Sequence, residues 1–265
     1  MIKPVFTDTH AHLYLQEFDH DRDQVMHRAE KNCVYYLFLP NIDSGSAEQM
    51  LKVCENWPHL CYPMMGLHPT SVRANYRQEL NAVRSYLSEA RYRFFGVGEI
   101  GIDLYWDRTF EKEQTEAFNI QLDLAIEYHL PVAIHTRNSM GIALDVMEGR
   151  NDKGLNGVFH CFSGDVVQAE RTVKLGFHLG IGGVVTYRKS GLADVVAAMP
   201  IESLLLETDA PFLPPVPHRG KRNESSYIPL IAQKIAEIKG VTLEEVAEVT
   251  TRNAINLFKM KNSHV

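Results

Sequence analysis

Eight short apolar segments, separated by longer segments with helix-like spacing, constrain the fold of this chain more than any other feature. They are rich in Val, Ile, Leu and Phe, and several lack strict alternation, as is typical of strands covered on both faces. Strands that alternate with helices indicate βα units and a parallel sheet. We therefore expect strands at Val5–His12, Tyr35–Asn41, Cys61–His68, Phe94–Gly101, Pro131–Thr136, Gly157–Ser163, Gly176–Gly183 and Leu204–Ala210.

The segments between these runs predict helices. The clearest is Glu111–His129, whose apolar residues recur at three- and four-residue spacings and form one stripe. Thr242 with Glu245 three residues later is typical of the capping box at a helix start. The other helices are expected at 46–57, 78–91, 139–148, 165–175, 227–239 and 242–258.

The length favours one domain. The chain has 265 residues, close to the roughly 250 residues of a (β/α)8 barrel. No linker or shift in composition divides it, so we expect a single α/β domain, a TIM barrel over residues 1–265 that includes the C-terminal helices at 227–258. A doubly wound open sheet is the alternative. Gly96, Gly98 and Gly101 spell a GxGxxG pattern, but no helix follows at once, so we expect no dinucleotide or other organic cofactor.

Charge and cysteine content narrow the class of protein. Lys and Arg number 27 against 33 Asp and Glu, a net charge of −6, which excludes the basic surface of a protein that coats nucleic acid. The four cysteines form no CxxC pair, which indicates a reducing compartment. Met1–Thr9 shows no leader pattern and no stretch reaches the roughly 18 apolar residues of a membrane span, so we expect a cytoplasmic protein without membrane contact.

Side chains that bind metals stand at the ends of five predicted strands. His10 and His12 alternate along a strand, so they point to the same side about 6.6 Å apart. An isolated pair of histidines, or a single carboxylate, more often has a structural role than a metal-binding one. The C-terminal ends of barrel strands, however, meet at the face that carries the active site. A metal centre is therefore predicted at His10, His12, Glu99, His135, His160 and Asp209.

Six ligands are too many for one tetrahedral ion, whereas two divalent ions can share a bridging carboxylate and a bridging water. Glu99 is the expected bridge because its strand lies between the others that supply ligands. One ion would be held by His10 and His12, and the other by His135 and His160. Magnesium, manganese and zinc all suit this set of ligands.

Water activated by metal is the nucleophile that the sequence supports. There is no G-x-S-x-G elbow. Cys161 follows His160 directly and is expected to point away from it. Asp209 would bind a metal and accept the proton of the water, so that Asp209 and Glu99 are the predicted catalytic residues.

The chain resembles the TatD family of metal-dependent deoxyribonucleases. Six motifs carry the resemblance, in the family's order: DTHAH at 8–12, GLHP at 66–69, GEIGID at 98–103, HTR at 135–137, HCFSG at 160–164 and ETDAPFL at 207–213. The resemblance implies an amidohydrolase-type barrel, two divalent metals and hydrolysis of phosphodiester bonds in DNA, often from a 3′ end. It places the metal-ligand role on the same six residues. Asn138 and Ser225 depart from the family pattern, at the rim of the pocket.

Two further residues could contact the substrate. His68 ends the third predicted strand and Arg137 follows His135 by two residues, so both could meet a phosphate. The alternatives are a salt bridge at the rim for Arg137 and support of a metal ligand for His68.

The loop after the fourth strand offers further polar and aromatic groups. Asp103, like Asp8, is expected to orient histidines or loops, since ligating imidazoles usually donate their second N–H to such acceptors. Tyr105 and Trp106 could stack a base, although packing within the loop is the simpler interpretation.

These features predict a two-metal hydrolase that cleaves phosphodiester bonds in DNA with a metal-bridging hydroxide, as a 3′-5′ exonuclease. The acidic net charge favours single-stranded or end-exposed DNA over long duplexes. The alternative is an amidohydrolase-type enzyme that acts on a small amide, lactone or phosphoester. Such enzymes often bridge their metals with a modified lysine, whereas this chain has Glu99 there. A binding protein without activity would be expected to lack a ligand, and all six are present.

Overall fold

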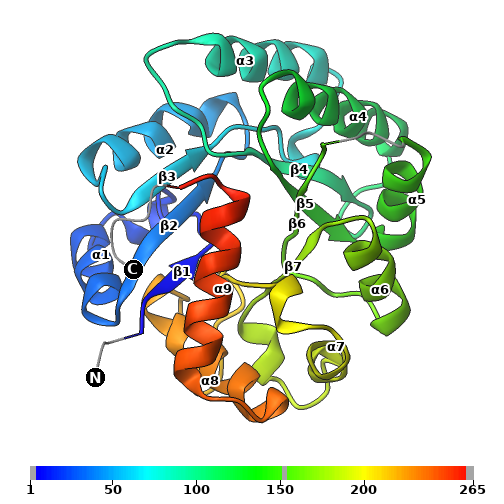
Figure 1. Cartoon of the computed structure of the whole chain (residues 1–265). Helices are drawn as coiled ribbons and strands as arrows, with labels where there is room; N and C mark the ends of the chain where they lie inside the picture. The colour runs from blue at the N-terminus through cyan, green and yellow to red at the C-terminus, as the bar shows by residue number, and fades with distance from the viewer. Residues whose placement is uncertain (1–3, 151–153, 261–265) are drawn as a thin grey trace.

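A ring of parallel strands surrounded by helices forms the centre of the molecule (Figure 1). The computed structural model describes residues 4–150 and 154–260. The prediction of no leader pattern in Met1–Thr9 therefore falls partly outside the described residues, at Met1–Lys3. All eight predicted strands are present, and several are shorter than expected. They are β1 (Phe6–Asp8), β2 (Val34–Pro40), β3 (Cys61–Met64), β4 (Val97–Asp103), β5 (Val132–Arg137), β6 (Gly157–Phe159), β7 (His178–Ile181) and β8 (Leu204–Leu206).

The strands form two parallel sheets, β1-β2-β3 and β4-β5-β6-β7-β8. Backbone hydrogen bonds join the sheets at both seams. Thr9 N donates to Leu206 O at 2.9 Å, while Met65 N donates to Gly96 O and Gly98 N to Met65 O, each at 3.1 Å. The strands therefore form one ring, which confirms the predicted (β/α)8 barrel over the open sheet.

Helices cover the outside of the ring, and each predicted helix is present within a few residues of its expected ends. Two more helices, α1 and α7, were not predicted. No helix in the described part of the chain is long and apolar enough to cross a membrane. The helices are α1 (Arg22–Lys31), α2 (Ser44–Asn56), α3 (Tyr76–Ser88), α4 (Glu111–Glu127), α5 (Met140–Arg150), α6 (Val166–Lys174), α7 (Leu192–Ala198), α8 (Ile228–Lys239) and α9 (Leu243–Leu257).

Helix α9 closes the N-terminal end of the barrel. It begins where predicted, with Thr242 Oγ1 accepting a hydrogen bond from Glu245 N at 3.1 Å. Its far end packs against side chains that point into the ring, and the Phe38 and Phe258 rings lie 3.9 Å apart. Apolar packing thus fills this end of the barrel, which leaves the opposite end, where the strands finish, for a site.

Gly101 lets β4 approach β5 closely beside the predicted metal ligands. Its φ of +138° is a conformation that side chains rarely adopt, and a Cβ there would lie 2.1 Å from His135 O. The GxGxxG pattern thus runs into strand β4, which contains Gly98 and Gly101.

Replacing this glycine tests the close approach. Gly101→Ala should lower the free energy of unfolding by about 2 to 6 kcal/mol, because backbone strain and overpacking each cost roughly 1 to 3 kcal/mol. The matched control is Gly141→Ala in α5, where nothing lies within 4 Å of the added Cβ. This control should be neutral or up to about 1 kcal/mol more stable. Equal unfolding midpoints for the two variants in urea would contradict the prediction.

Candidate metal centre

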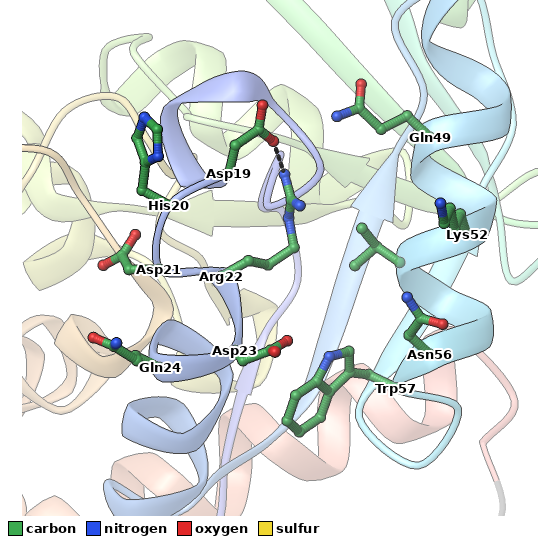
Figure 2. A pocket seen from close by; sticks show the side chains of 11 residues that line it. Asp19, His20, Asp21, Arg22, Asp23, Gln24, Gln49, Lys52, Asn56 and Trp57 are labelled. Atoms are coloured by element: carbon green, nitrogen blue, oxygen red, sulfur yellow. Dashed lines mark hydrogen bonds and ion pairs between the residues drawn. The ribbon is translucent and has the colours of Figure 1, made fainter.

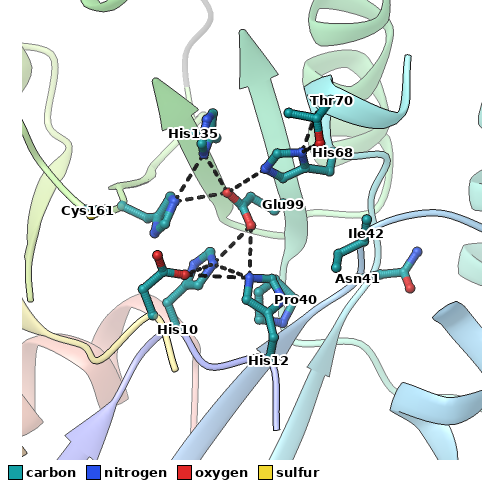
Figure 3. Close-up of polar contacts among 12 residues, drawn as sticks. His10, His12, Pro40, Asn41, Ile42, His68, Thr70, Glu99, His135 and Cys161 are labelled. Carbon is teal, nitrogen blue, oxygen red and sulfur yellow. Dashed lines mark hydrogen bonds and ion pairs between the residues drawn. The ribbon is translucent and has the colours of Figure 1, made fainter. Parts of the chain in front are cut away.

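The predicted ligands meet at the end of the barrel where the strands finish (Figure 3). They surround a cavity of about 580 Å³ that is also lined by residues of the loops after β4, β6, β7 and β8. The predicted residues on its wall are His12, His68, Glu99, His135, Arg137, His160 and Asp209. The convergence expected from the strand ends is therefore present in the structure.

One oxygen of Glu99 faces the histidines that follow β1. Oε2 lies 3.0 Å from His10 Nε2 and 3.3 Å from His12 Nε2. The two Nε2 atoms are 3.3 Å apart, although β1 itself ends at Asp8 and both histidines follow in the next segment. Asp209 Oδ1 lies 3.7 Å from His12 Nε2 and 3.9 Å from His10 Nε2. This first group could hold one cation.

The other oxygen of Glu99 faces a second group of imidazoles. Oε1 lies 2.8 Å from His135 Nδ1, 2.9 Å from His160 Nε2 and 3.1 Å from His68 Nε2. Figure 3 shows Glu99 between the labelled His68 and His135 on one side and His10 and His12 on the other. The carboxylate thus faces a different set of nitrogens with each oxygen, as expected for a bridge between two sites.

The imidazoles decide the charge of Glu99. Its side chain is only 2% exposed, and such burial would by itself raise the pKa of a carboxyl. The nearby His68, His160 and His10 outweigh that effect and hold the pKa of Glu99 well below its usual range. Asp209 differs, because burial raises its pKa to about 6. A proton on Asp209 would compete with a cation held there, so acidification should weaken binding of the cation.

Tyr14 orients His12, a role that the sequence did not predict. The Tyr14 hydroxyl donates to Pro40 O at 2.7 Å and lies 3.0 Å from His12 Nδ1. Since that hydroxyl hydrogen is already used, His12 Nδ1 must be the donor in the second contact. The lone pair of His12 Nε2 then faces Glu99 and is free for a metal. Tyr14 stands two residues after His12, and this spacing is the sequence feature that could have indicated the contact.

His68 has the opposite tautomer. Its Nδ1 accepts a hydrogen bond from Thr70 N at 3.1 Å, so the proton of the neutral ring is on Nε2. A protonated nitrogen cannot bind a metal, but it can donate to Glu99 or to a phosphate oxygen. Both interpretations offered for His68 from the sequence agree with this arrangement.

Carboxylates lie behind two further rings, those of His135 and His160. Asp103 Oδ2 lies 2.9 Å from His135 Nε2, in the orienting role expected for Asp103. Glu207, which the sequence analysis missed, is fully buried and lies 3.4 Å from His160 Nδ1. A Cβ at position 180 would lie 2.3 Å from Glu207 Oε2, so Gly180 makes the space for this carboxylate.

Asp8 fixes the segment that carries Asp209. Its Oδ2 accepts from Thr208 Oγ1 at 2.6 Å and its Oδ1 from Thr208 N at 2.9 Å. Asp209 has a φ of +57°, and its N–H donates to His10 O at 2.9 Å. The structure thus places Asp8 in the orienting role expected from its position.

The Arg137 side chain lies exposed at the rim of the cavity. Its guanidinium lies 3.8 Å from the centre of the Tyr105 ring and 5.1 Å from that of Trp106. No carboxylate of the described residues lies within 4 Å of it, so the alternative of a rim salt bridge is wrong. Tyr105 and Trp106 are also largely exposed, which argues against simple packing within the loop.

The expected orientation of Cys161 is wrong. Strand β6 ends at Phe159, so strand alternation no longer applies, and Cys161 has a φ of +46° and lines the cavity. Burial and the nearby Asp209 raise the pKa of its thiol well above the usual value. The thiol therefore stays protonated and is a poor nucleophile.

A second cavity, of about 390 Å³, lies between α1 and α2 and is lined by polar and charged side chains (Figure 2). Its Arg22 is paired with Asp19 at 2.7 Å. Within residues 4–150 and 154–260, each cluster of His, Cys, Asp or Glu that could hold a metal lies at the barrel site instead.

Comparison with known proteins identifies the family. The sequence model described as TatD related DNase matches residues 7–259. The chain belongs to the TatD family. An uncharacterised metal-dependent hydrolase of Bacillus subtilis, YabD, is 34% identical over 254 residues, which are 96% of this chain and 98% of YabD. A TatD protein of Erwinia tasmaniensis, named as a 3′-5′ ssDNA/RNA exonuclease, is 30% identical and covers 96% of this chain and 99% of its own length.

Solved structures agree with this assignment. The crystal structure of YjjV, a TatD homologue from Escherichia coli, superposes with a TM-score of 0.91 at 32% identity and covers 97% of this chain and 98% of YjjV. A phosphotriesterase homology protein from E. coli, at 14% identity and a TM-score of 0.72, shows the same barrel fold over 97% of this chain and 100% of its own. The chain is thus a metal-dependent hydrolase of the TatD type, in a barrel shared with amidohydrolases.

The orienting carboxylates should matter for metal affinity. Asp103→Asn should lower the affinity of the site for metal about 10- to 100-fold, since removing an orienting acceptor usually has an effect of that size. Calorimetric titration with manganese or zinc measures this affinity. The matched control is Asp107→Asn in the same loop, because the hydrogen bonds of the Asp107 side chain among the described residues involve Thr109 and none of the proposed metal ligands. Unchanged affinity in Asp103→Asn would contradict the prediction.

Proposed function

We propose that this TatD protein is a two-metal nuclease that hydrolyses phosphodiester bonds at the 3′ ends of single-stranded DNA. The observation that carries the proposal is the position of Glu99, whose oxygens face two separate groups of imidazoles. A buried carboxylate in that position suits a bridge between two divalent ions. The named activity of the Erwinia relative supports a nucleic acid substrate.

The structure offers enough donors for both ions. His10, His12 and Asp209 would hold one ion with Glu99 Oε2, and His135 and His160 the other with Glu99 Oε1. The orphaned Nδ1 of the buried His10 and the tautomer fixed on His12 agree with neutral imidazoles that bind through Nε2. Imidazoles and carboxylates together suit zinc or manganese, and the carboxylates also suit magnesium.

The protein residues supply binding and proton transfer. When bound, the two ions would activate water at neutral pH and neutralise charge on the phosphate that is attacked. Asp209, beside the first group of ligands, would accept the proton of the attacking water. The Nε2–H of His68 would donate to a phosphate oxygen, and so would the guanidinium of Arg137 at the rim.

The first test of the proposal is the number of metal ions that each chain binds. Protein refilled with excess manganese or zinc should contain about two ions per chain by elemental analysis, and Glu99→Gln should lose at least one. A single ion in the wild-type protein, with Glu99 making no contact to it in a crystal structure, would contradict the two-metal proposal.

Asp209 is tested by a change that keeps its size. Asp209→Asn still offers an oxygen to a metal but cannot accept a proton, so turnover should fall about a thousandfold or more while metal content is largely kept. The control is Asp194→Asn, an exposed carboxylate in the first turn of α7. Activity of Asp209→Asn within about tenfold of wild type, with both ions bound, would assign the proton step to another group, with His68 the next to test.

The substrate is tested with labelled oligonucleotides. Single-stranded DNA labelled at the 5′ end should shorten step by step from its 3′ end, faster than a duplex does. A small phosphodiester and a lactone serve as comparison substrates. Cleavage of the lactone alone would instead assign the chain to the small-molecule hydrolases that share its barrel.

A further inference from the structure

Two large aromatic side chains stand uncovered beside the metal centre. Tyr105 is 53% exposed and Trp106 is 69% exposed, directly after β4, which carries Glu99. Their rings meet edge to face with centres 4.9 Å apart, and Trp106 lines the catalytic cavity. A soluble protein usually covers such surface, so an exposed tryptophan at a cavity suggests a ligand with a flat face.

Arg137 completes this group from the neighbouring strand. Its guanidinium lies over the Tyr105 ring at 3.8 Å, which restrains the side chain by a cation–π contact. Stacking uses the flat face of a guanidinium and leaves the N–H groups at its edge free to donate. Because no carboxylate of the described chain pairs with these donors, they can bind an anion.

The opposite rim of the cavity is apolar as well. Phe212 is 48% exposed and Leu213 is 39% exposed, in the loop that follows β8, and both line the cavity. Strands β4 and β8 are four apart in a ring of eight, so the two loops rise on opposite sides of the metal centre. The mouth thus combines an aromatic surface and a free cation on one side with an apolar wall on the other.

We propose that Trp106, Tyr105 and Arg137 form a platform that binds the terminal nucleotide of a single strand, with the base stacked on Trp106 and a phosphate on Arg137. This inference rests on the proposed function and adds how the strand end is recognised. In a duplex the faces of a base are covered by its neighbours, so a free base face is found at an unpaired end. Stacking accepts every base, so we expect little sequence preference.

Trp106→Ala tests the platform. It should lower kcat/KM on single-stranded DNA about 10- to 100-fold, the usual effect of losing a stacked base, and Trp106→Phe should restore most of the loss. Trp106→Ala should keep the metal content of the wild-type enzyme, because the proposed metal ligands are unchanged. Arg137→Ala should keep its metal content and lower kcat/KM on DNA about 10- to 1,000-fold. Val167→Ala, an exposed apolar position on α6, is the matched control for lost apolar surface.

A substrate lacking the last base gives the decisive comparison. The wild-type enzyme should cleave an oligonucleotide with an abasic 3′ end as slowly as Trp106→Ala cleaves the intact oligonucleotide. Trp106→Ala should cleave the intact and the abasic oligonucleotide at the same rate. Equal wild-type rates on intact and abasic ends would overturn the platform. A loss of bound metal in Trp106→Ala would overturn it too, because the role of Trp106 would then be structural.

Binding can be followed without turnover. The chain has two tryptophans, so a Trp57→Phe background leaves Trp106 as the reporter. In that background Asp209→Asn loaded with manganese should show fluorescence quenching on addition of single-stranded DNA, and no quenching with the abasic oligonucleotide. Absence of quenching by intact DNA would overturn the platform. Quenching without any DNA cleavage by the wild-type enzyme would instead leave the platform supported and reject the proposed nuclease activity.

Discussion

A single buried carboxylate determines how the whole active end of this barrel is built. Glu99 is 2% exposed, and an isolated charge in that position would cost several kcal/mol. Five imidazoles surround it, with nitrogens between 2.8 and 3.3 Å from its two oxygens. Rings this close repel each other when all are protonated, and His10 and His12 approach to 3.3 Å. A pair of dications would satisfy the carboxylate and the imidazoles together, which is the physical reason for a metal centre here.

The barrel holds these groups in place through contacts that lie outside the cavity. Apolar packing under α9 fills the other end, where Phe258 lies 3.9 Å from Phe38. Gly101 and Gly180 let backbone or carboxylate groups come closer than a Cβ would allow. Tyr14, Asp103 and Glu207 then turn three imidazoles toward Glu99. These three rings are restrained from behind, so the site needs little rearrangement to bind an ion.

Much of this could be predicted from the sequence, because it depends on local pattern. Apolar runs located the eight strands, and the residue types at their ends located the side chains that meet around Glu99. Helix α1 was missed because only Val25, Met26 and Ala29 are buried in it, and α7 because seven residues show little periodicity. The orientation of Cys161 was wrong because β6 ends two residues earlier. Glu207 was missed because its partners come from distant strands, which no local pattern records.

The division between rigid strands and loops also separates chemistry from substrate choice. The proposed metal ligands are held by buried contacts, whereas the side chains of Trp106, Tyr105 and Arg137 contact one another at the surface. A protein of net charge −6 cannot attract a polyanion over its whole surface, so the proposed recognition of DNA would have to be local. An unpaired guanidinium with an exposed indole supplies local charge and a stacking face at once. Asp103 connects the two parts, because its Oδ1 accepts from Tyr105 N at 2.9 Å while its Oδ2 lies 2.9 Å from His135 Nε2. Replacing the Trp106 or Tyr105 side chain leaves these backbone contacts in place, whereas moving the backbone of the loop would disturb a ring that faces Glu99.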